Sequence, residues 1–416
     1  MRIGLFTDSY PPYINGVSTS VAMLKSALEK KGHTVYLVTV SNNALKYEID
    51  NKHNIIRIPG IPIGIYDYRL SRIYPLSMIN TMKNWNLDVI HSHTEFGVGI
   101  LARLFAKQFS IPLVHTYHTL YEDYTHYITH GYFDKSSKKV VEYLTKFYCD
   151  KTATELIVPT NKIYDLFKDK YKFEKNIHII PTGIEVERFF VENVDRKEVA
   201  KLKKQLNLTK RDFTIVFVGR LASEKNVLFL LNVLEKLISK KYNNIKLLIV
   251  GDGPDKEYFE QVSKDKKIAS NTIFTGKVAW EDMPYYYHVA DIFITASITE
   301  TQGLTVIEAM ASSITPLCIK DQAFVNTVTD ELNGLIFNNE EECFNDIIKL
   351  YKDKDYRERL AHQARIQSEH FSATHYAQQV LEVYNRAIKT NEKTKYGLFT
   401  KLVNKVKDKS NNDNIK

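Results

Sequence analysis

Short apolar runs alternate with amphipathic helical segments along this chain, and no other feature restricts the fold as much. In the first half, runs with the length of buried strands lie at Ile3–Thr7, Val35–Val40, Val89–Ser92, Pro112–Thr116 and Leu156–Pro159. Between the first two runs, Val17–Lys31 has helical periodicity and stops at Gly32. Strands that alternate with helices predict βαβ units and a parallel sheet.

The same alternation starts again in the second half. The Lys-rich stretch Glu192–Arg211 separates the halves, and further strand-like runs lie at Phe213–Val218, Lys246–Val250, Thr272–Phe274, Asp291–Thr295 and Thr315–Ile319. We therefore expect an α/β protein with two doubly wound Rossmann-like domains that face an interdomain cleft. Ligands of such sheets bind outside the carboxyl ends of the strands, so the site is expected in that cleft.

The charge of the chain favours an anionic partner. Its 416 residues carry a net charge of +8 at pH 7, which is typical of proteins that bind nucleic acid, an anionic membrane or a phosphorylated substrate. A coding sequence rich in A and T explains the same composition. No apolar run is long enough to span a bilayer, the first residues do not have the pattern of a signal peptide, and the three cysteines lack metal-ligand spacing.

Two loops of the second half combine cations, glycines and carboxylates. Gly219, Arg220 and Lys225 follow an apolar strand, and a guanidinium and an ammonium can together neutralise a diphosphate. Glu300 and Glu308 flank a glycine turn at Gly303. Such a turn offers backbone N–H groups to an anion at a helix N-terminus, while the two carboxylates can accept hydrogen bonds from sugar and ribose hydroxyls.

Two positions of the first half are further candidates. Asn15-Gly16 turns the chain into a helix, where Gly16 allows a phosphate or sugar close to the backbone. His118 lies just beyond the carboxyl end of a strand, where it can bind a sugar hydroxyl. Zinc binding by His91, His93, His115 and His118 is conceivable from spacing, but no cysteine or carboxylate completes the set, so no metal is expected.

As a set, these motifs identify a family resemblance. Gly16-Val17, Thr116-x-His118, Gly219-Arg220 with Lys225-Asn226, Gly251-Asp-Gly-Pro254, and Glu300 with Glu308 resemble the retaining glycosyltransferases of family 4, which have the GT-B fold. The resemblance covers about residues 1–390. One departure is Ser313, which occupies the place of a glycine that the family usually has after its Glu-Ala-Met-Ala sequence.

The resemblance implies roles for individual residues. Arg220 and Lys225 would hold the diphosphate of UDP, and Glu308 would bind the ribose hydroxyls. Glu300 and His118 would be the catalytic residues that act on the transferred glucose. The remaining donor-binding positions would be Gly16, Gly303 and Leu304. The resemblance implies UDP-glucose as the donor substrate, with no permanently bound cofactor and no metal.

One segment of the first half resembles a particular subgroup of this family. Residues 115–127 are similar to bacterial 1,2-diacylglycerol 3-glucosyltransferases, which make monoglucosyldiacylglycerol, and the acceptor-side candidates in this segment are Tyr121, Asp123, Tyr124 and His126. The implied domains are an acceptor-binding domain at 1–185, a nucleotide-sugar domain at 186–371, a helix at 372–390 that returns to the first domain, and a basic amphipathic tail at 391–416.

A diacylglycerol acceptor requires contact with a bilayer. Lysines surround an apolar helical face in the tail, and Lys135–Lys146 and Tyr66–Lys83 are further basic segments. Such helices bind anionic interfaces. We therefore expect a cytoplasmic protein that is peripheral on the inner face of the cell membrane, with a UDP-sugar, diacylglycerol and anionic lipid as partners.

Three other functions share part of this pattern. A related family-4 hexosyltransferase that extends a glycolipid or builds a surface polysaccharide would use the same donor residues. A nucleotide-sugar epimerase would need an acid and a base on opposite faces of the pocket, and the sequence does not indicate such a pair. A nucleic-acid-binding protein would need a binding module, and none is recognised.

Overall fold

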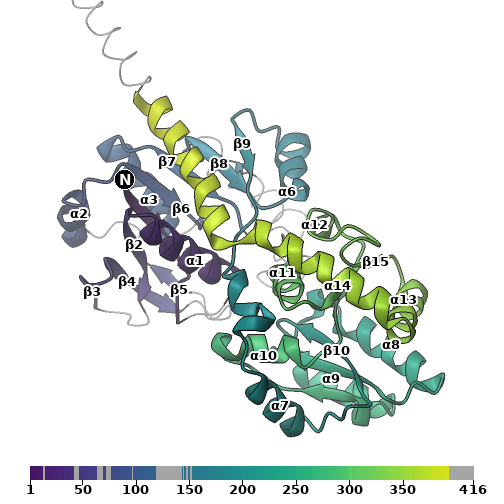
Figure 1. Cartoon of the computed structure of the whole chain (residues 1–416). Coiled ribbons are helices and arrows are strands. Elements are labelled where there is room, and N and C mark those ends of the chain that lie inside the picture. The colour runs from purple at the N-terminus through teal and green to yellow at the C-terminus, as the bar shows by residue number, and fades with distance from the viewer. Residues whose placement is uncertain are drawn as a thin grey trace, which may run out of the picture. The chain divides into compact units, whose positions relative to one another are not determined.

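The computed structural model describes residues 1–12, 15–41, 46–62, 69–71, 76–95, 97–118, 143, 145–146, 149, 152–298, 300 and 302–392. Contacts divide these residues into two compact units (Figure 1). Unit 1 contains the described parts of Met1–Pro159, of Tyr164–Ile180 and of the chain from Tyr376 to Glu392, and unit 2 contains Thr160–Ile163 and the described parts of Pro181–His375. The long continuous part of unit 2 therefore begins after Ile180, whereas the sequence predicted a domain boundary five residues later, after residue 185.

Unit 1 is built on a nine-stranded, mostly parallel sheet. The strand order is β3-β4-β2-β1-β6-β7-β8-β9, and β5 pairs with β4. Only the β3–β4 and β4–β5 pairs are antiparallel among the described strands. The strands are β1 (Arg2–Phe6), β2 (Thr34–Ser41), β3 (Glu48–Asp50), β4 (Ile55–Pro62), β5 (Arg69–Ser71), β6 (Val89–Ser92), β7 (Leu113–Thr116), β8 (Glu155–Val158) and β9 (Ile177–Ile179).

Helices α1 (Gly16–Lys30), α2 (Leu76–Lys83) and α3 (Val98–Phe109) belong to unit 1, and α6 (Asn161–Asp165) and a π-helix (Leu166–Lys170) follow β8. Phe6 and Ile90 pack with Leu101 of α3 in one core cluster. Because side chains alternate along a strand, residues such as Leu5 and His91 point to the opposite face. The central strands are therefore buried on both faces, which explains their continuous apolar runs.

Residues 373–392 form the last described helix, and it belongs to unit 1 from Tyr376 on. The Ser372 hydroxyl caps this helix by accepting a 3.2 Å hydrogen bond from the His375 amide. Tyr376 and Tyr384 are buried, and the Tyr384 hydroxyl lies 2.7 Å from Nδ1 of His91 in β6. In Figure 1 the helix (yellow) lies beside α1, in agreement with the 3.5 Å contact between the hydroxyls of Ser20 and Tyr376.

Unit 2 contains a six-stranded parallel sheet in the order β12-β11-β10-β13-β14-β15. Its strands are β10 (Phe213–Val218), β11 (Ile245–Val250), β12 (Thr272–Phe274), β13 (Ile292–Thr295), β14 (Thr315–Ile319) and β15 (Leu335–Phe337). Its α-helices are α7 (Arg196–Gln205), α8 (Val227–Ser239), α9 (Lys256–Asp265), α10 (Met283–His288), α11 (Leu304–Ala311), α12 (Gln322–Val325), α13 (Glu340–Lys352) and α14 (Lys354–Ser368). Short 3-10 helices occupy Val186–Phe189, Val191–Asn193, Ser223–Lys225, Ala269–Asn271, Trp280–Asp282 and Glu369–Phe371.

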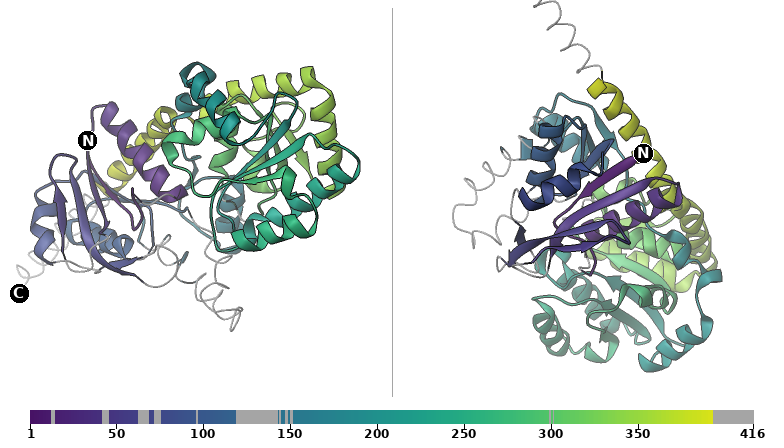
Figure 2. Two further views of the ribbon diagram at one scale, coloured as in Figure 1. Left: turned by 90° about the horizontal axis from the view of Figure 1, so that it is seen from below. Right: turned by 90° about the vertical axis from the view of Figure 1, so that its left-hand side faces the viewer.

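Helices cover both faces of this second sheet (Figure 2). Ile215 of β10 packs on the side of α8 and α13. Its neighbour Val216 packs on the side of α10 and α11. Each unit is thus a doubly wound Rossmann-like domain, as the alternation of strands and helices predicts.

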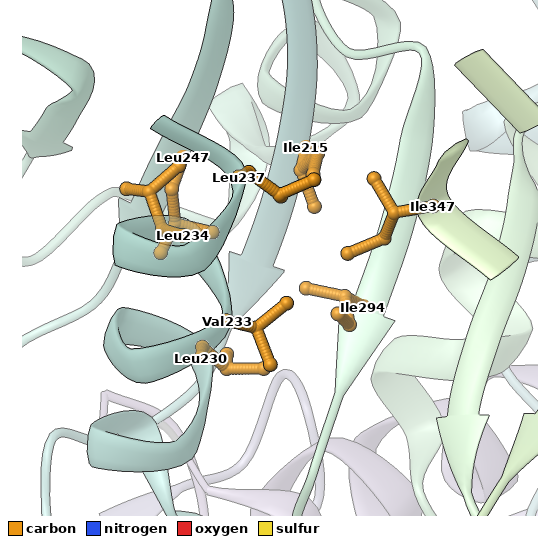
Figure 3. A pocket seen from close by; sticks show the side chains of 8 residues that line it. All are labelled: Ile215, Leu230, Val233, Leu234, Leu237, Leu247, Ile294 and Ile347. Atoms are coloured by element: carbon orange, nitrogen blue, oxygen red, sulfur yellow. The ribbon is translucent and has the colours of Figure 1, made fainter. Parts of the chain in front are cut away.

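A small cavity lies inside unit 2, between the sheet and helices α8 and α13 (Figure 3). Its volume is about 10 Å³, and its wall consists of Ile215, Leu230, Val233, Leu234, Leu237, Leu247, Ile294 and Ile347. Because the wall offers no polar partner, we expect the cavity to be dry. It is a packing defect of the core, and it is too small for a substrate.

Ser313 adopts the backbone conformation that the resemblance assigns to glycine. Its φ is +57°, and it ends α11 with hydrogen bonds from Ser313 N to Met310 O (3.0 Å) and from Ile314 N to Ala309 O (3.2 Å). The turn therefore keeps the left-handed geometry of a helix C-terminus despite the serine.

We expect Ser313→Gly to stabilise the protein by about 0.5–1 kcal/mol, because a left-handed backbone is strained with a Cβ and unstrained in glycine. Denaturant unfolding of the whole protein measures this difference in the free energy of unfolding. The matched control is Ser312→Gly, which removes a buried hydroxyl that donates to Glu308 O at 2.9 Å and should destabilise. A loss of stability in Ser313→Gly would contradict the strain argument.

Candidate active site

The strand order of unit 2 reverses between β10 and β13. These strands lie side by side and parallel, with Ile215 opposite Ile292, but β11 follows β10 on the other side. The loops after two such strands diverge and leave a ligand site at the carboxyl edge of the sheet. Here the two loops are 219–226 and 296–303, and they contain the predicted residues Arg220, Lys225, Glu300 and Gly303.

Both predicted cations of the first loop form ion pairs. Arg220 Nη2 donates to Glu224 Oε1, with the arginine side chain 31% and the glutamate 6% exposed. Lys225 Nζ donates to Glu300 Oε1 and joins the two loops directly. Burial favours a raised pKa for Glu300, but the charge and hydrogen bond of Lys225 outweigh it, so the pKa lies below its ordinary value. Glu300 is therefore an anion at neutral pH.

Sequence reasoning missed a second lysine at this site. Lys162 Nζ donates to the carbonyl oxygens of Ile298 (3.3 Å) and Glu300 (3.4 Å) and to both carboxylate oxygens of Asp321, at 2.8 and 3.0 Å. Lys162 follows β8 and Asp321 follows β14. The rule that functional side chains gather at the carboxyl ends of strands would have pointed to both residues. Their pair fixes the backbone of the loop that carries Glu300.

Gly303 begins helix α11 in a conformation that requires glycine. Its φ is +76°, and a Cβ at this position would lie 2.6 Å from Cε1 of Phe324. Gly303 has no side chain to cap the helix, and the first turn contains no acidic residue. The helix N-terminus, with Leu304 as its first residue, thus has the partial positive charge that favours a bound anion.

Glu308 lies one turn into α11 and is buried. It accepts a 2.6 Å hydrogen bond from the Tyr287 hydroxyl, and both side chains are less than 9% exposed. Burial raises the pKa of Glu308 to about 7, although the hydrogen bond from Tyr287 opposes this shift. The carboxyl therefore changes its charge near neutral pH. No sequence pattern distinguishes Tyr287 from the neighbouring tyrosines.

The glycine turn after β11 packs against the loop 219–226 that follows β10. Gly251 has a φ of +140°, and a Cβ there would lie 1.9 Å from Gly219 O. Leu221 N donates to Asp252 O at 3.0 Å, and Asp255 N donates to Leu221 O at 3.0 Å. These contacts fix the backbone on either side of Arg220.

In unit 1, the strand order reverses at β1, which lies between β2 and β6. Gly16 is exposed at the first position of α1. The side chain of Asn15 caps this helix by accepting from Ser18 N at 2.8 Å, and its amide donates to Ser9 Oγ at 2.7 Å. Gly16 therefore begins a helix that the Asn15 side chain caps, one residue earlier than expected.

The four histidines of unit 1 lie together at the carboxyl ends of β6 and β7. Their side chains are hydrogen bonded: His93 Nδ1 lies 3.0 Å from His118 Nε2, and His115 Nε2 lies 3.0 Å from Glu95 Oε1. His91 contacts the hydroxyls of Tyr384 and Thr116, each at 2.7 Å. Within the described part of the chain, no three His, Cys, Asp or Glu side chains have the arrangement of a metal site.

Several predicted residues lie outside the described residues. They are the acceptor-side candidates Tyr121, Asp123, Tyr124 and His126, nearly all of the tail at 391–416, and most of Lys135–Lys146. The segment Tyr66–Lys83 is described only at 69–71 and 76–83. Their roles remain predictions. Among the helices of the described chain, none has the length and apolar character needed to cross a bilayer.

Two family models match the chain in succession. The family described as Glycosyltransferase Family 4 matches residues 14–188, and the family described as Glycosyl transferases group 1 matches residues 198–367. Solved structures agree in fold: sucrose-phosphate synthase from Thermosynechococcus elongatus has a TM-score of 0.74 at 19% identity and covers 93% of this chain and 99% of its own. HepE from Anabaena, in complex with UDP, has a TM-score of 0.71 at 16% identity and covers 93% and 100%.

Curated relatives extend over nearly the whole chain. The alpha-monoglucosyldiacylglycerol synthase of Acholeplasma laidlawii is 35% identical and covers 94% of this chain and 99% of its own length. The protein of the same name from Streptococcus pneumoniae is 34% identical and covers 94% and 87%. Two Rossmann-like units with cation-bearing and glycine-bearing loops at the strand ends, together with these similarities, define a glycosyltransferase with the GT-B fold. The chain belongs to the family-4, group-1 glycosyltransferases.

Proposed function

We propose that this chain transfers glucose from UDP-glucose to 1,2-diacylglycerol, with retention of configuration, and so produces 3-O-α-glucosyl-diacylglycerol. The observation that carries the proposal is the 34–35% identity, over 94% of the chain, to two alpha-monoglucosyldiacylglycerol synthases. The choice of UDP is supported by fold relatives in complex with UDP and with UDP-glucose. It is also supported by the cations Arg220 and Lys225 of the loop after β10, where Lys225 pairs with Glu300 in the loop that precedes α11.

Five side chains of unit 2 have roles in the proposed reaction. Arg220 and Lys225 bind the diphosphate, with the backbone N–H groups at Gly303 and Leu304 as further donors. Glu308 accepts hydrogen bonds from the ribose hydroxyls, and Tyr287 orients its carboxylate. Glu300, held by Lys225, accepts from hydroxyls of the transferred sugar.

During transfer, the bond between the anomeric carbon and the diphosphate oxygen breaks, the oxygen of the acceptor hydroxyl bonds to that carbon, and the hydroxyl proton passes to the departing diphosphate. The departing UDP gains negative charge, so Arg220, Lys225 and the dipole of α11 stabilise the transition state more than the bound substrate. In unit 1, His118 is proposed to bind the transferred glucose, and Gly16 to face the diphosphate. The loops need no metal for these roles.

The decisive experiment is incubation of the purified protein with UDP-glucose and mixed micelles that contain diacylglycerol or glucosyldiacylglycerol. We expect monoglucosyldiacylglycerol from the first micelles, with α configuration at the new bond. Product only from glucosyldiacylglycerol would assign the chain to glycolipid extension instead. Transfer only to soluble saccharides would assign it to polysaccharide synthesis.

The raised pKa of Glu308 predicts a pH-dependent donor affinity. Above pH 7 the carboxylate accepts hydrogen bonds from ribose. Below pH 7 it becomes protonated, so the affinity for UDP-glucose should fall by up to about tenfold per pH unit if the protonated form does not bind. Calorimetric titration without acceptor measures this dependence. In Glu308→Gln the affinity should be lower and nearly constant between pH 5.5 and 8, and an equally steep slope in that variant would exclude Glu308 as its source.

The lipid acceptor predicts electrostatic binding to membranes. We expect activity on vesicles to rise with the fraction of anionic lipid and to fall with added salt, which screens charges beyond about 8 Å at physiological ionic strength. Deletion of residues 393–416 should weaken co-sedimentation with anionic vesicles and leave UDP affinity intact, because the donor loops lie in unit 2. Equal binding to neutral and anionic vesicles would contradict this docking mode.

A further inference from the structure

His93 has a buried ring nitrogen without a hydrogen-bond partner among the described residues. Its Nδ1 lies 3.0 Å from Nε2 of His118. Its Nε2 is buried and has no hydrogen-bond partner in that part of the chain. The residue is 1% exposed, so bulk water does not reach the nitrogen. The lack of a partner at Nε2 of His93 determines whether His93 or His118 donates the hydrogen bond between them.

Both rings are neutral at physiological pH. Burial lowers the pKa of His93 well below its ordinary value and lowers the pKa of His118 to about 4. A neutral imidazole carries one N–H and one bare nitrogen, so exactly one ring of the pair can donate across the 3.0 Å contact.

The two possible arrangements differ in what they leave buried. If His118 donated, the proton of His93 would lie on Nε2, as a buried N–H with no acceptor among the described residues. If His93 donates, its Nε2 is a bare lone pair. Orphaned buried N–H groups are rarer than under-satisfied acceptors, and an unsatisfied buried donor costs about 1–3 kcal/mol. The second arrangement is therefore favoured.

Neighbouring groups hold the ring of His93 in place for this contact. It lies against His91, with ring centroids 4.0 Å apart, and stacks on His118 at 5.3 Å with an interplanar angle of 24°. His91 is itself fixed at both nitrogens, by the hydroxyls of Tyr384 and Thr116. The packing against His91 thus restricts the orientation of the His93 ring in its contact with His118.

We propose that His93 is a positioning residue for the transfer reaction: it donates from Nδ1 to Nε2 of His118 and thereby holds His118 as the tautomer with its proton on Nδ1. His118 then acts toward the transferred sugar as a hydrogen-bond donor, and a sugar hydroxyl oxygen accepts. This inference rests on the proposed function, in which His118 contacts the sugar.

Two substitutions separate the hydrogen bond from the volume of the ring. In His93→Asn the side-chain amide reaches the place of Nδ1 and can donate to His118, whereas His93→Leu fills the space without a donor. We expect His93→Leu to lower turnover by about tenfold or more, since 1.36 kcal/mol corresponds to a factor of ten. The affinity for UDP should stay within about threefold of wild type, and His93→Asn should recover most of the turnover.

A surface histidine supplies the control. His53 is exposed and pairs with Asp50, so His53→Leu should leave both turnover and UDP affinity unchanged. Thermal unfolding of each variant tests that it is folded. Wild-type turnover in a folded His93→Leu protein would overturn the proposal. Turnover in His93→Asn as low as in His93→Leu would also overturn it, because the ring rather than the donor would then matter.

Nitrogen spectroscopy tests the tautomer independently of activity. In protein labelled with ¹⁵N-histidine, the His118 resonances are assigned by their loss in His118→Ala. We expect Nδ1 of His118 to be protonated and Nε2 to be bare, and the reverse would overturn the proposal. If His118→Ala keeps normal turnover, the catalytic role of His118 fails while the tautomer stays measurable. If His118→Ala is impaired, adding His93→Leu should lower turnover no further.

Discussion

Replacing Arg220 with alanine is expected to weaken the affinity for UDP by about ten- to hundredfold. Removal of a charge-assisted hydrogen bond to a phosphate costs about 1.5–3 kcal/mol, and the guanidinium can bind two phosphate oxygens at once. Arg220 is one-third exposed and positioned by the Gly219 and Gly251 turns, so the substitution leaves the surrounding backbone in place. Isothermal titration with UDP measures the loss.

The control for this substitution is another ion pair of unit 2. Lys236 on α8 pairs with Glu341 on α13, and neither residue belongs to the two loops of the donor site, so Lys236→Ala should leave UDP affinity unchanged. Arg220→Lys keeps the charge but loses the paired donors, and an intermediate affinity is expected. Unchanged UDP affinity in a folded Arg220→Ala protein would remove Arg220 from the donor site.

Replacing Glu300 with glutamine is expected to lower turnover by about ten- to hundredfold and to change UDP affinity by less than about threefold. Hydrogen bonds from sugar hydroxyls to a carboxylate are worth roughly 1.5–3 kcal/mol each, and in the proposal they strengthen as the sugar departs from UDP. Because Glu300 is held ionised by Lys225 and Lys162, the neutral amide removes the charge with little change in shape. Steady-state transfer kinetics and UDP titration together give this comparison.

Lys162→Met provides the matched test of how the loop is held. This substitution removes the hydrogen bonds to Ile298 O, Glu300 O and Asp321 without touching the carboxylate of Glu300. We expect a smaller fall in turnover than in Glu300→Gln, because Glu300 keeps its partner Lys225. A parallel fall in UDP affinity and turnover in Glu300→Gln would place Glu300 on the nucleotide rather than the sugar.

The sequence predicted the central architecture because its signal there is strong. Buried parallel strands favour mostly apolar runs, and β1, β10, β11 and β13 have them. The strands that escaped prediction are peripheral or irregular. β3, β5, β9 and β15 have three residues each, and β4 contains Pro59, Gly60 and Pro62, so none of them shows a clear period.

The candidate site was predictable only where one loop carries several signals. The sequence indicated Arg220, Lys225 and Glu300 because glycines and charges cluster there, and the structure joins Lys225 to Glu300. Lys162 and Asp321 lie 159 positions apart, and only the fold brings them together. The same holds for His93 and His118, which were indicated as neighbours of strand ends but not as a hydrogen-bonded pair.

The last described helix, 373–392, gives the chain an interleaved order of assembly. Unit 1 contains both the described part of the first 159 residues and residues 376–392, so nearly all of unit 2 is encoded between two parts of unit 1. On the ribosome, His91 emerges almost 300 residues before its partner Tyr384. Unit 2 is complete in sequence before the histidine cluster of unit 1 has its full set of contacts. The amino-terminal unit is therefore the first to begin and the last to be finished.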